Sequence, residues 1–158
     1  MSNFKEIQKN YDSLKKEYPS LPEFSKMLQT FGYMEEDDVK SVVTLYSWAK
    51  KTPANVAQWI AHHLTPGDML SANDAKFVKP IREDLLNSLK ICASLSKKMS
   101  LSSFESTLNK NPEEVLAKTL GEAATELEPV VLTAKKMLKL SLEGWTNEEK
   151  EEEVNYRW

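Results

Sequence analysis

Residues 112–143 read PEEVLAKTLGEAATELEPVVLTAKKMLKLSLE and hold the longest helical pattern in the chain. Apolar side chains recur there every three or four residues, which is the spacing of one face of an α-helix. These positions are Leu116, Leu120, Ala124, Leu127, Val131, Ala134, Leu138 and Leu142. Because the phase is kept across Pro129, we predict one helix that is kinked at the proline and ended by Gly144. Beyond Pro129 the apolar arc widens to about 200°, which indicates the central helix of a bundle.

Turn and capping residues divide the rest of the chain into further helices. The chain has four glycines and seven prolines, and the prolines stand where helices are expected to begin. We expect helices over about 3–17, 20–32, 35–51, 52–64, 80–99, 102–108 and 112–143, and a short acidic helix from Thr146. No alternation typical of strands is present. The sequence therefore predicts an all-α fold, a single-domain bundle of seven or eight helices around a long kinked C-terminal helix.

Individual caps support several of these boundaries. Residues 20–23, SLPE, fit a capping box that opens a helix ending at Gly32. Residues 102–105, SSFE, fit a cap that separates a helix ending near Met99 from a short one. The helix of residues 35–51 starts with four acids and ends with two lysines, which complements its dipole. Its buried side chains should be Val39, Val42, Val43, Tyr46 and Ala49.

The domain organisation follows from the same pattern. We assign residues 1–145 to the helical domain, with residues 1–18 as a docking arm, and residues 146–158 to an acidic C-terminal tail. The single cysteine, Cys92, cannot form an intramolecular disulfide, and no signal peptide or long apolar run is visible. These features favour a soluble protein of the reducing cytoplasm with no membrane partner.

Charge is divided unevenly along the chain. The net charge is −3, but residues 39–110 carry ten Lys or Arg against five acids, and residues 111–158 carry six against eleven. The middle of the chain is therefore +5 and the C-terminal part −5. A chain of this kind can attract an anionic partner locally, or another copy of itself in a head-to-tail manner.

The residues that most often carry catalysis or bind metals occur here in unsuitable patterns. His62 and His63 are adjacent, and neighbours on a helix point about 100° apart, whereas zinc-binding helices use an i, i+4 pair. Cys92 falls on an inward-facing stripe, and the acidic pairs at 35–38 and 113–114 occupy first turns, where carboxylates complement free N–H groups. We therefore predict no catalytic residue, no metal and no cofactor, and rank a helical enzyme without a recognised motif third among the function hypotheses.

Lysines supply the alternative hypothesis, which is binding of RNA or DNA in a nucleocapsid-like assembly protein or a small nucleoprotein subunit. Backbone phosphates would be bound by Lys50, Lys51, Lys76, Lys79, Arg82, Lys97, Lys98, Lys135, Lys136 and Lys139. Trp48 or Phe77 could stack on bases. Arginine is scarce, which disfavours sequence-specific readout. The other reading of the lysines is that they serve helix dipoles and solubility.

The leading hypothesis is a non-enzymatic helical interaction or assembly protein, which self-associates or docks onto a larger complex. Its first helix has an apolar stripe only about 80° wide, which is typical of a helix that docks along one seam. Aromatic side chains near the C-terminus are typical anchors for a partner's pocket. The predicted partner-binding residues are Phe4, Ile7, Tyr11, Leu14, Trp48, Tyr156 and Trp158. The alternative is that both ends fold back onto their own bundle.

Overall fold

The computed structural model describes the backbone of residues 3–64 and 81–155 and the side chains of residues 3–61, 81–140 and 142. All regular structure in these ranges is helical, so the predicted all-α class is confirmed. The elements are α1 (Asn3–Glu17), α2 (Phe24–Phe31), the 3-10 helix η1 (Glu36–Val39), α3 (Val42–Ala49), α4 (Lys51–Leu64), α6 (Arg82–Thr107) and α7 (Pro112–Asn155). The predicted count of seven or eight helices is not confirmed, because several predicted boundaries differ from the observed ones.

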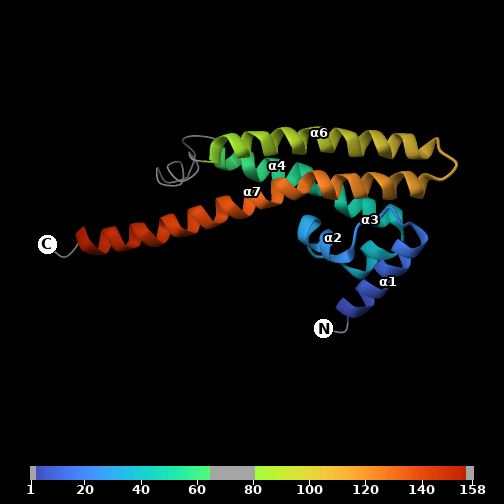
Figure 1. The fold of residues 1–158 in the computed structure, drawn as a ribbon, viewed down its shortest axis with the longest axis horizontal. Coiled ribbons are helices and arrows are strands. Elements are labelled where there is room, and N and C mark those ends of the chain that lie inside the picture. The colour runs from blue at the N-terminus through green and yellow to red at the C-terminus, as the bar shows by residue number, and fades with distance from the viewer. Residues whose placement is uncertain (1–2, 65–80, 156–158) are drawn as a thin grey trace.

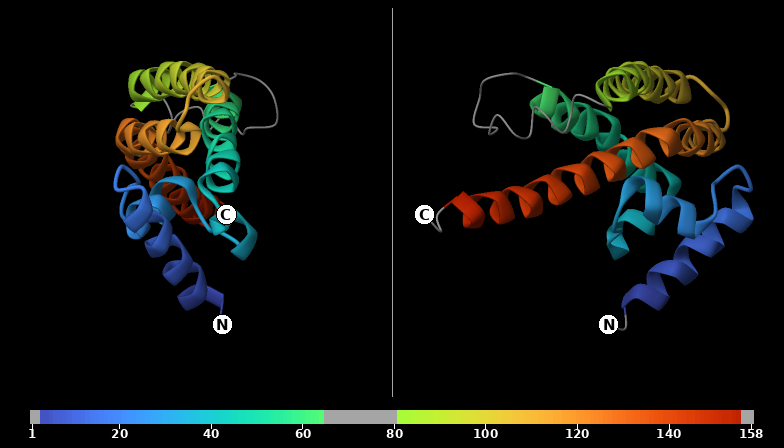
Figure 2. Two further views of the ribbon diagram at one scale, coloured as in Figure 1. Left: turned by 90° about the vertical axis from the view of Figure 1, so that its right-hand side faces the viewer. Right: turned by 60° about the vertical axis from the view of Figure 1, so that its left-hand side comes forward.

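Helices α2, α3 and α6 make the main contacts with α7. Figure 1 shows α6 and this half of α7 side by side in antiparallel directions, and α4 packs against α6. Helices α2 and α3 contact α7 from below in that view, while α1 packs against η1 and α2. The second half of α7 leaves the other helices and extends away from them, as Figure 1 and the right-hand view of Figure 2 both show.

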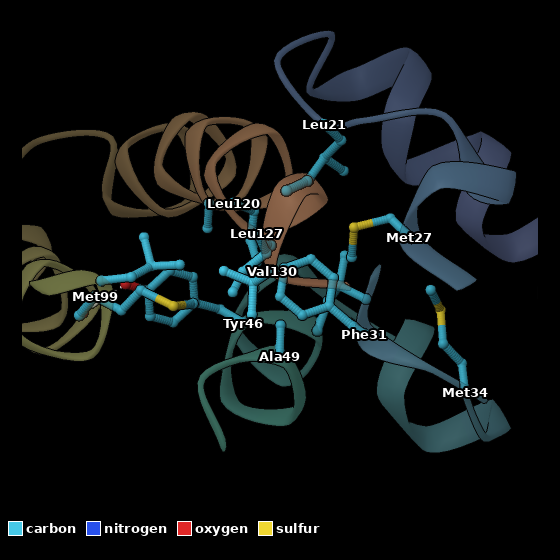
Figure 3. Close-up of a cluster of buried hydrophobic side chains, with 14 of the residues drawn as sticks. Leu21, Met27, Phe31, Met34, Tyr46, Ala49, Met99, Leu120, Leu127 and Val130 are labelled. Atoms are coloured by element: carbon cyan, nitrogen blue, oxygen red, sulfur yellow. Dashed lines mark hydrogen bonds between the residues drawn. The ribbon is translucent and has the colours of Figure 1, made fainter. Parts of the chain in front are cut away.

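The apolar core lies where α7 meets α2, α3 and α6. Leu120, Leu127 and Val130 of α7 are fully buried there. Figure 3 shows side chains from α2, α3 and α6 gathered around them, including Met27, Phe31, Tyr46, Ala49 and Met99. The Tyr46 hydroxyl donates a hydrogen bond to the carbonyl of Met99, which ties α3 to α6 inside this core. The first half of α7 therefore contributes much of the core, whereas the widened apolar arc beyond Pro129, which predicted the central helix of a bundle, lies on the half that leaves the other helices.

One glycine permits a close approach between α7 and the connection from α1 to α2. A Cβ added to Gly121 would lie 2.6 Å from the carbonyl oxygen of Ser20, far inside van der Waals contact. The connection is also held by α1, because the Tyr11 hydroxyl donates to the carbonyl of Pro22 and Lys15 Nζ donates to that of Leu21 at 3.0 Å. These contacts hold the connection outside any helix, so the capping box predicted at residues 20–23 does not form. Helix α2 instead begins after Glu23 without a side-chain cap, and it ends at Gly32 (φ 96°) as predicted.

The helix predicted over residues 35–51 is broken at Ser41. The Ser41 Oγ accepts the N–H of Thr44 at 3.1 Å, and the Ser41 N–H donates to Thr44 Oγ1 at 3.1 Å. This capping box starts α3 afresh at Val42. Val39, Val42, Tyr46 and Ala49 are buried as predicted, whereas Val43 is 49% exposed and Leu45 is fully buried.

Helix α6 is continuous where two helices were predicted. Ser103 does not cap a new helix, because its hydroxyl donates to the carbonyl of Met99 in the preceding turn at 3.1 Å. The Ser106 hydroxyl donates to the carbonyl of Ser103 in the same way at 2.8 Å. Ser102 is buried and receives a hydrogen bond from Thr119 of α7 at 2.9 Å. Serines that bond backward or to a neighbouring helix leave the backbone ladder intact, so the helix runs on to Thr107.

Helix α7 runs through Pro129, as predicted, and continues past the predicted end at Gly144 to Asn155. It therefore crosses the predicted boundary between the helical domain and the acidic tail. The predicted inward stripe is buried only in the first half. Val130 and Met137 are buried beyond the proline, whereas Leu138 is exposed.

No helix in the described ranges is both long enough and apolar enough to cross a membrane.

Candidate interaction surfaces

The apolar stripe of α1 packs on its own domain. Ile7 and Tyr11 are buried in the core, and Leu14 packs against it at the edge. Phe4 is partly exposed, and its ring lies 5.7 Å from that of Phe24, centroid to centroid. The stripe of α1 is thus covered by the chain's own side chains. Of the α1 residues predicted to bind a partner, Phe4 is the one with a substantially exposed side chain.

Of the three other aromatic residues predicted to bind a partner, the structure describes only Trp48. Trp48 is partly exposed at the end of α3, and its ring lies 6.0 Å from that of Phe31. Its packing against α2 accounts for its position outside the predicted inward arc of α3. Tyr156 and Trp158 lie outside the described residues.

Two of the predicted phosphate-binding lysines have partners within the chain. Lys98 Nζ lies 3.0 Å from a carboxylate oxygen of Glu122 and 3.1 Å from one of Glu126, both on α7. These hydrogen bonds raise the pKa of Lys98 above its ordinary value. Lys50 Nζ donates to Ser103 Oγ at 3.5 Å. The side chain of Lys98 in particular joins α6 to α7 and is already neutralised.

The other basic residues of the prediction are distributed over separate elements. Lys51, Arg82 and Lys97 are exposed at the start of α4, at the start of α6 and in the middle of α6. Three lysines lie together on the exposed second half of α7, at positions 135, 136 and 139. Lys76, Lys79 and Phe77 lie outside the described residues. The described lysines therefore form one local group on α7 and several isolated positions.

The second half of α7, residues 131–155, extends beyond the other helices, as Figure 1 shows. We call it the arm. Leu132 and Leu138 are 62% and 54% exposed, although an apolar side chain on a packed helix would be covered. Met137 is buried, so the first turns of the arm still touch the body. Beyond residue 142 the backbone stays helical to Asn155, and this segment carries six glutamates and one lysine.

A second uncovered apolar surface runs along α6, and we call it the α6 stripe. Phe104 is 74% exposed and Leu108 is 91% exposed. The stripe positions follow one another at intervals of three or four residues and fall within an arc of about 80°. They are Leu86, Lys90, Ala93, Lys97, Leu101, Phe104 and Leu108, all of them exposed. The buried residues of α6, such as Leu85, Cys92 and Met99, lie on the opposite side of the helix.

Sequence reasoning missed the α6 stripe because it divided this region between a helix ending near Met99 and a separate short helix. The signal is visible in the sequence once residues 82–107 are taken as one helix. Two apolar stripes then lie on opposite sides of it, and only one of them can face the core.

The chain matches no known protein family, no curated protein sequence and no solved structure. Its function therefore has to be argued from these surfaces alone.

The residue types that most often bind metals or act as nucleophiles are placed as follows in the described residues. The described part of the chain contains no cluster of three or more His, Cys, Asp and Glu side chains placed to bind a metal, while the side chains of His62 and His63 lie outside it. Cys92 is fully buried, and burial raises the pKa of its thiol to about 11, so it is a poor nucleophile. The Asp38 carboxylate accepts the N–H of Glu35 at 2.8 Å, which is the first-turn role predicted for these acids.

A shallow groove between residues 20–26 and α7 is lined by several charged side chains. Lys26 Nζ lies 3.8 Å from Glu128 Oε2 at its edge, and Glu122 and Glu126 bind Lys98 as described above. Most of the charges that line the groove are therefore paired within the chain, and Lys118 is its exposed lysine without an ion pair among the described residues.

Proposed function

We propose that this chain is a non-enzymatic assembly protein that associates with further copies of itself through the arm. The supporting observation is the exposure of Leu132 and Leu138 on a helix that extends beyond the body to Asn155. A helix gains most of its stability in water from packing of its apolar face. Burying a leucine fully contributes about 1.5 to 3 kcal/mol, so covering these side chains would favour association.

The charges of the arm indicate the chemistry of the surface it would contact. Residues 143–155 have a net charge of −5, from six glutamates and one lysine. An apolar surface bordered by lysines would match this end of the arm and would bind more weakly at high salt. Docking onto a larger complex is the other form of the same hypothesis, with the arm again as the contact. The free thiol of Cys92 suits a protein that works in the reducing cytoplasm.

Sedimentation velocity over a range of concentrations tests this proposal. The full chain should sediment as a species heavier than the 18.1 kDa monomer, while a Leu138→Gln/Leu142→Gln variant should remain monomeric. Tyr33→Gln removes an exposed apolar side chain outside the arm and serves as the matched control. Association that is equally strong in the arm variant, or a full chain that is monomeric at every concentration, would overturn the proposal.

The alternative function, binding to the phosphate backbone of RNA or DNA, has one observation in its favour. Lys135, Lys136 and Lys139 are exposed and lie within two turns of one helix. The arm as a whole has four lysines and six glutamates, a net charge of −2, and a polyanion would be repelled by its end. Fluorescence anisotropy of a labelled single-stranded oligonucleotide at low and high salt tests this function. Tight binding at low salt that weakens with salt would support it over self-association.

A further inference from the structure

The exposed leucines of the arm, Leu132, Leu138 and Leu142, and the α6 stripe are apolar surfaces that the body of the chain leaves uncovered. In the stripe, Leu101, Phe104 and Leu108 follow one another on the outer side of α6 and are all more than half exposed. Lys90 and Lys97 lie on the same side and form no ion pair with any other described residue. The stripe is thus apolar with positive charges along it.

The arm cannot reach the α6 stripe of its own chain. It continues the same helix whose first half packs against the inner side of α6, and the stripe lies on the outer side. Figure 1 and the right-hand view of Figure 2 show the arm leading away from α6 rather than around it. Any arm that covers the stripe must therefore come from another molecule.

The two helices are similar in length, and the acidic end of the arm is opposite in charge to the lysines of the stripe. The stripe spans residues 86–108 and the arm residues 131–155, which correspond to about 33 Å and about 36 Å at roughly 1.5 Å per residue. The stripe carries Lys90 and Lys97, and the arm ends in a segment of net charge −5. When the two helices pack antiparallel, Leu138 and Leu142 of the arm lie along Leu101 and Phe104 of the stripe, and the acidic segment 143–155 lies along Lys90 and Lys97.

We infer that the arm of one copy packs along the α6 stripe of a second copy. This inference rests on the proposed function and names the surface that receives the arm. The contact joins two different surfaces, so each copy both gives an arm and receives one. Copies joined in this way form either reciprocal pairs, when two molecules exchange arms, or longer chains and rings.

A mixing experiment with two variants tests the inference. The arm variant is Leu138→Gln/Leu142→Gln, and the stripe variant is Leu101→Gln/Phe104→Gln. Each should be monomeric alone, because each lacks one half of the contact. An equimolar mixture should contain a heterodimer of twice 18.1 kDa, since the intact arm of one variant can bind the intact stripe of the other.

The outcomes separate this inference from the proposed function. A stripe variant that associates like the unaltered chain, while the arm variant is monomeric, would overturn the inference and leave the proposed function standing. An arm variant that still associates would overturn both. Two monomeric variants that form no heterodimer when mixed would exclude the arm-on-stripe contact and favour pairing of arm with arm.

Charge reversal gives a second test that does not depend on removing apolar side chains. Lys90→Glu/Lys97→Glu changes two exposed residues, so the variant should keep the far-UV circular dichroism and the urea midpoint of the unaltered chain. Its association should weaken at least tenfold at low salt, and the difference should diminish at high salt. Unchanged association at low salt would contradict the inference.

Discussion

Leu45 and Val43 lie two residues apart on α3 and are predicted to differ sharply in their contribution to stability. Leu45 is fully buried, and a Leu→Ala change at such a site costs about 2 to 5 kcal/mol from lost burial and the cavity left behind. Val43 is 49% exposed. Removing its two methyl groups therefore costs at most about half of roughly 1.6 kcal/mol, and the better helix propensity of alanine offsets part of that loss. The two variants should differ by at least about 1 kcal/mol.

Urea unfolding of Leu45→Ala and Val43→Ala, followed by circular dichroism at 222 nm, measures this difference directly. Both substitutions are to alanine on the same helix, so effects on the unfolded chain are closely matched. A continuous helix over residues 35–51 would bury Val43 instead, and Val43→Ala would then be the more damaging change. That result would refute the capping box at Ser41 and the packing of α3 derived from it.

Three further predictions concern the core and its titrating groups. Gly121→Ala should lower the free energy of unfolding by about 1 to 2 kcal/mol, because the clash with the Ser20 carbonyl outweighs the roughly 1 kcal/mol that alanine normally adds in a helix. Cys92 should react with a thiol reagent at neutral pH only as fast as the protein unfolds, so mild urea should accelerate its labelling, and prompt labelling of the folded chain would contradict its burial. Burial raises the pKa values of Tyr11, Tyr46 and Cys92, so these groups lose their protons at lower pH in the unfolded chain than in the folded one. The free energy of unfolding should therefore be constant below about pH 9 and fall steadily above it, and urea unfolding across pH 8–11 measures this change.

The sequence was sufficient for the helical class and for the elements with a single strong pattern. The bounds of α1 agree with the prediction, and Leu116, Leu120 and Leu127 of α7 are buried as their spacing indicates. Gly32 ends α2 because a left-handed residue is needed there, which is a local requirement that sequence can reveal.

The errors come from serines, whose role depends on what their hydroxyls can reach. The pattern predicts Ser41 inside a helix, but Ser41 caps one; it predicts a cap at Ser102 and Ser103, but both lie inside α6. The hydroxyl of Ser102 is satisfied by Thr119 on another helix, and no local pattern discloses that partner. Sequence spacing therefore identified the helices but could not decide where adjacent ones join.

Sequence spacing also could not decide which apolar surfaces face the core and which are exposed. A periodic apolar stripe is equally compatible with packing on the chain's own core and with packing on a partner. The apolar stripe of α1 is predicted to contact a partner, but it packs against the chain's own core. Leu138 is predicted to be buried in the core, but it is exposed. Deciding between these outcomes requires knowing how much apolar surface the neighbouring helices can cover, which is a property of the whole fold.

Intermolecular cross-linking can show whether the arm of one copy lies on the α6 stripe of another. One variant carries Lys135→Cys on the arm and the other carries Glu105→Cys beside the stripe, so the apolar side chains of the contact are kept, while the buried Cys92 gives little background. A short bismaleimide added to the mixture should yield a covalent dimer that contains one copy of each variant. Replacing the stripe variant by Tyr33→Cys should abolish that product. Cross-linking of arm only to arm, or equal yields with Tyr33→Cys, would contradict the account.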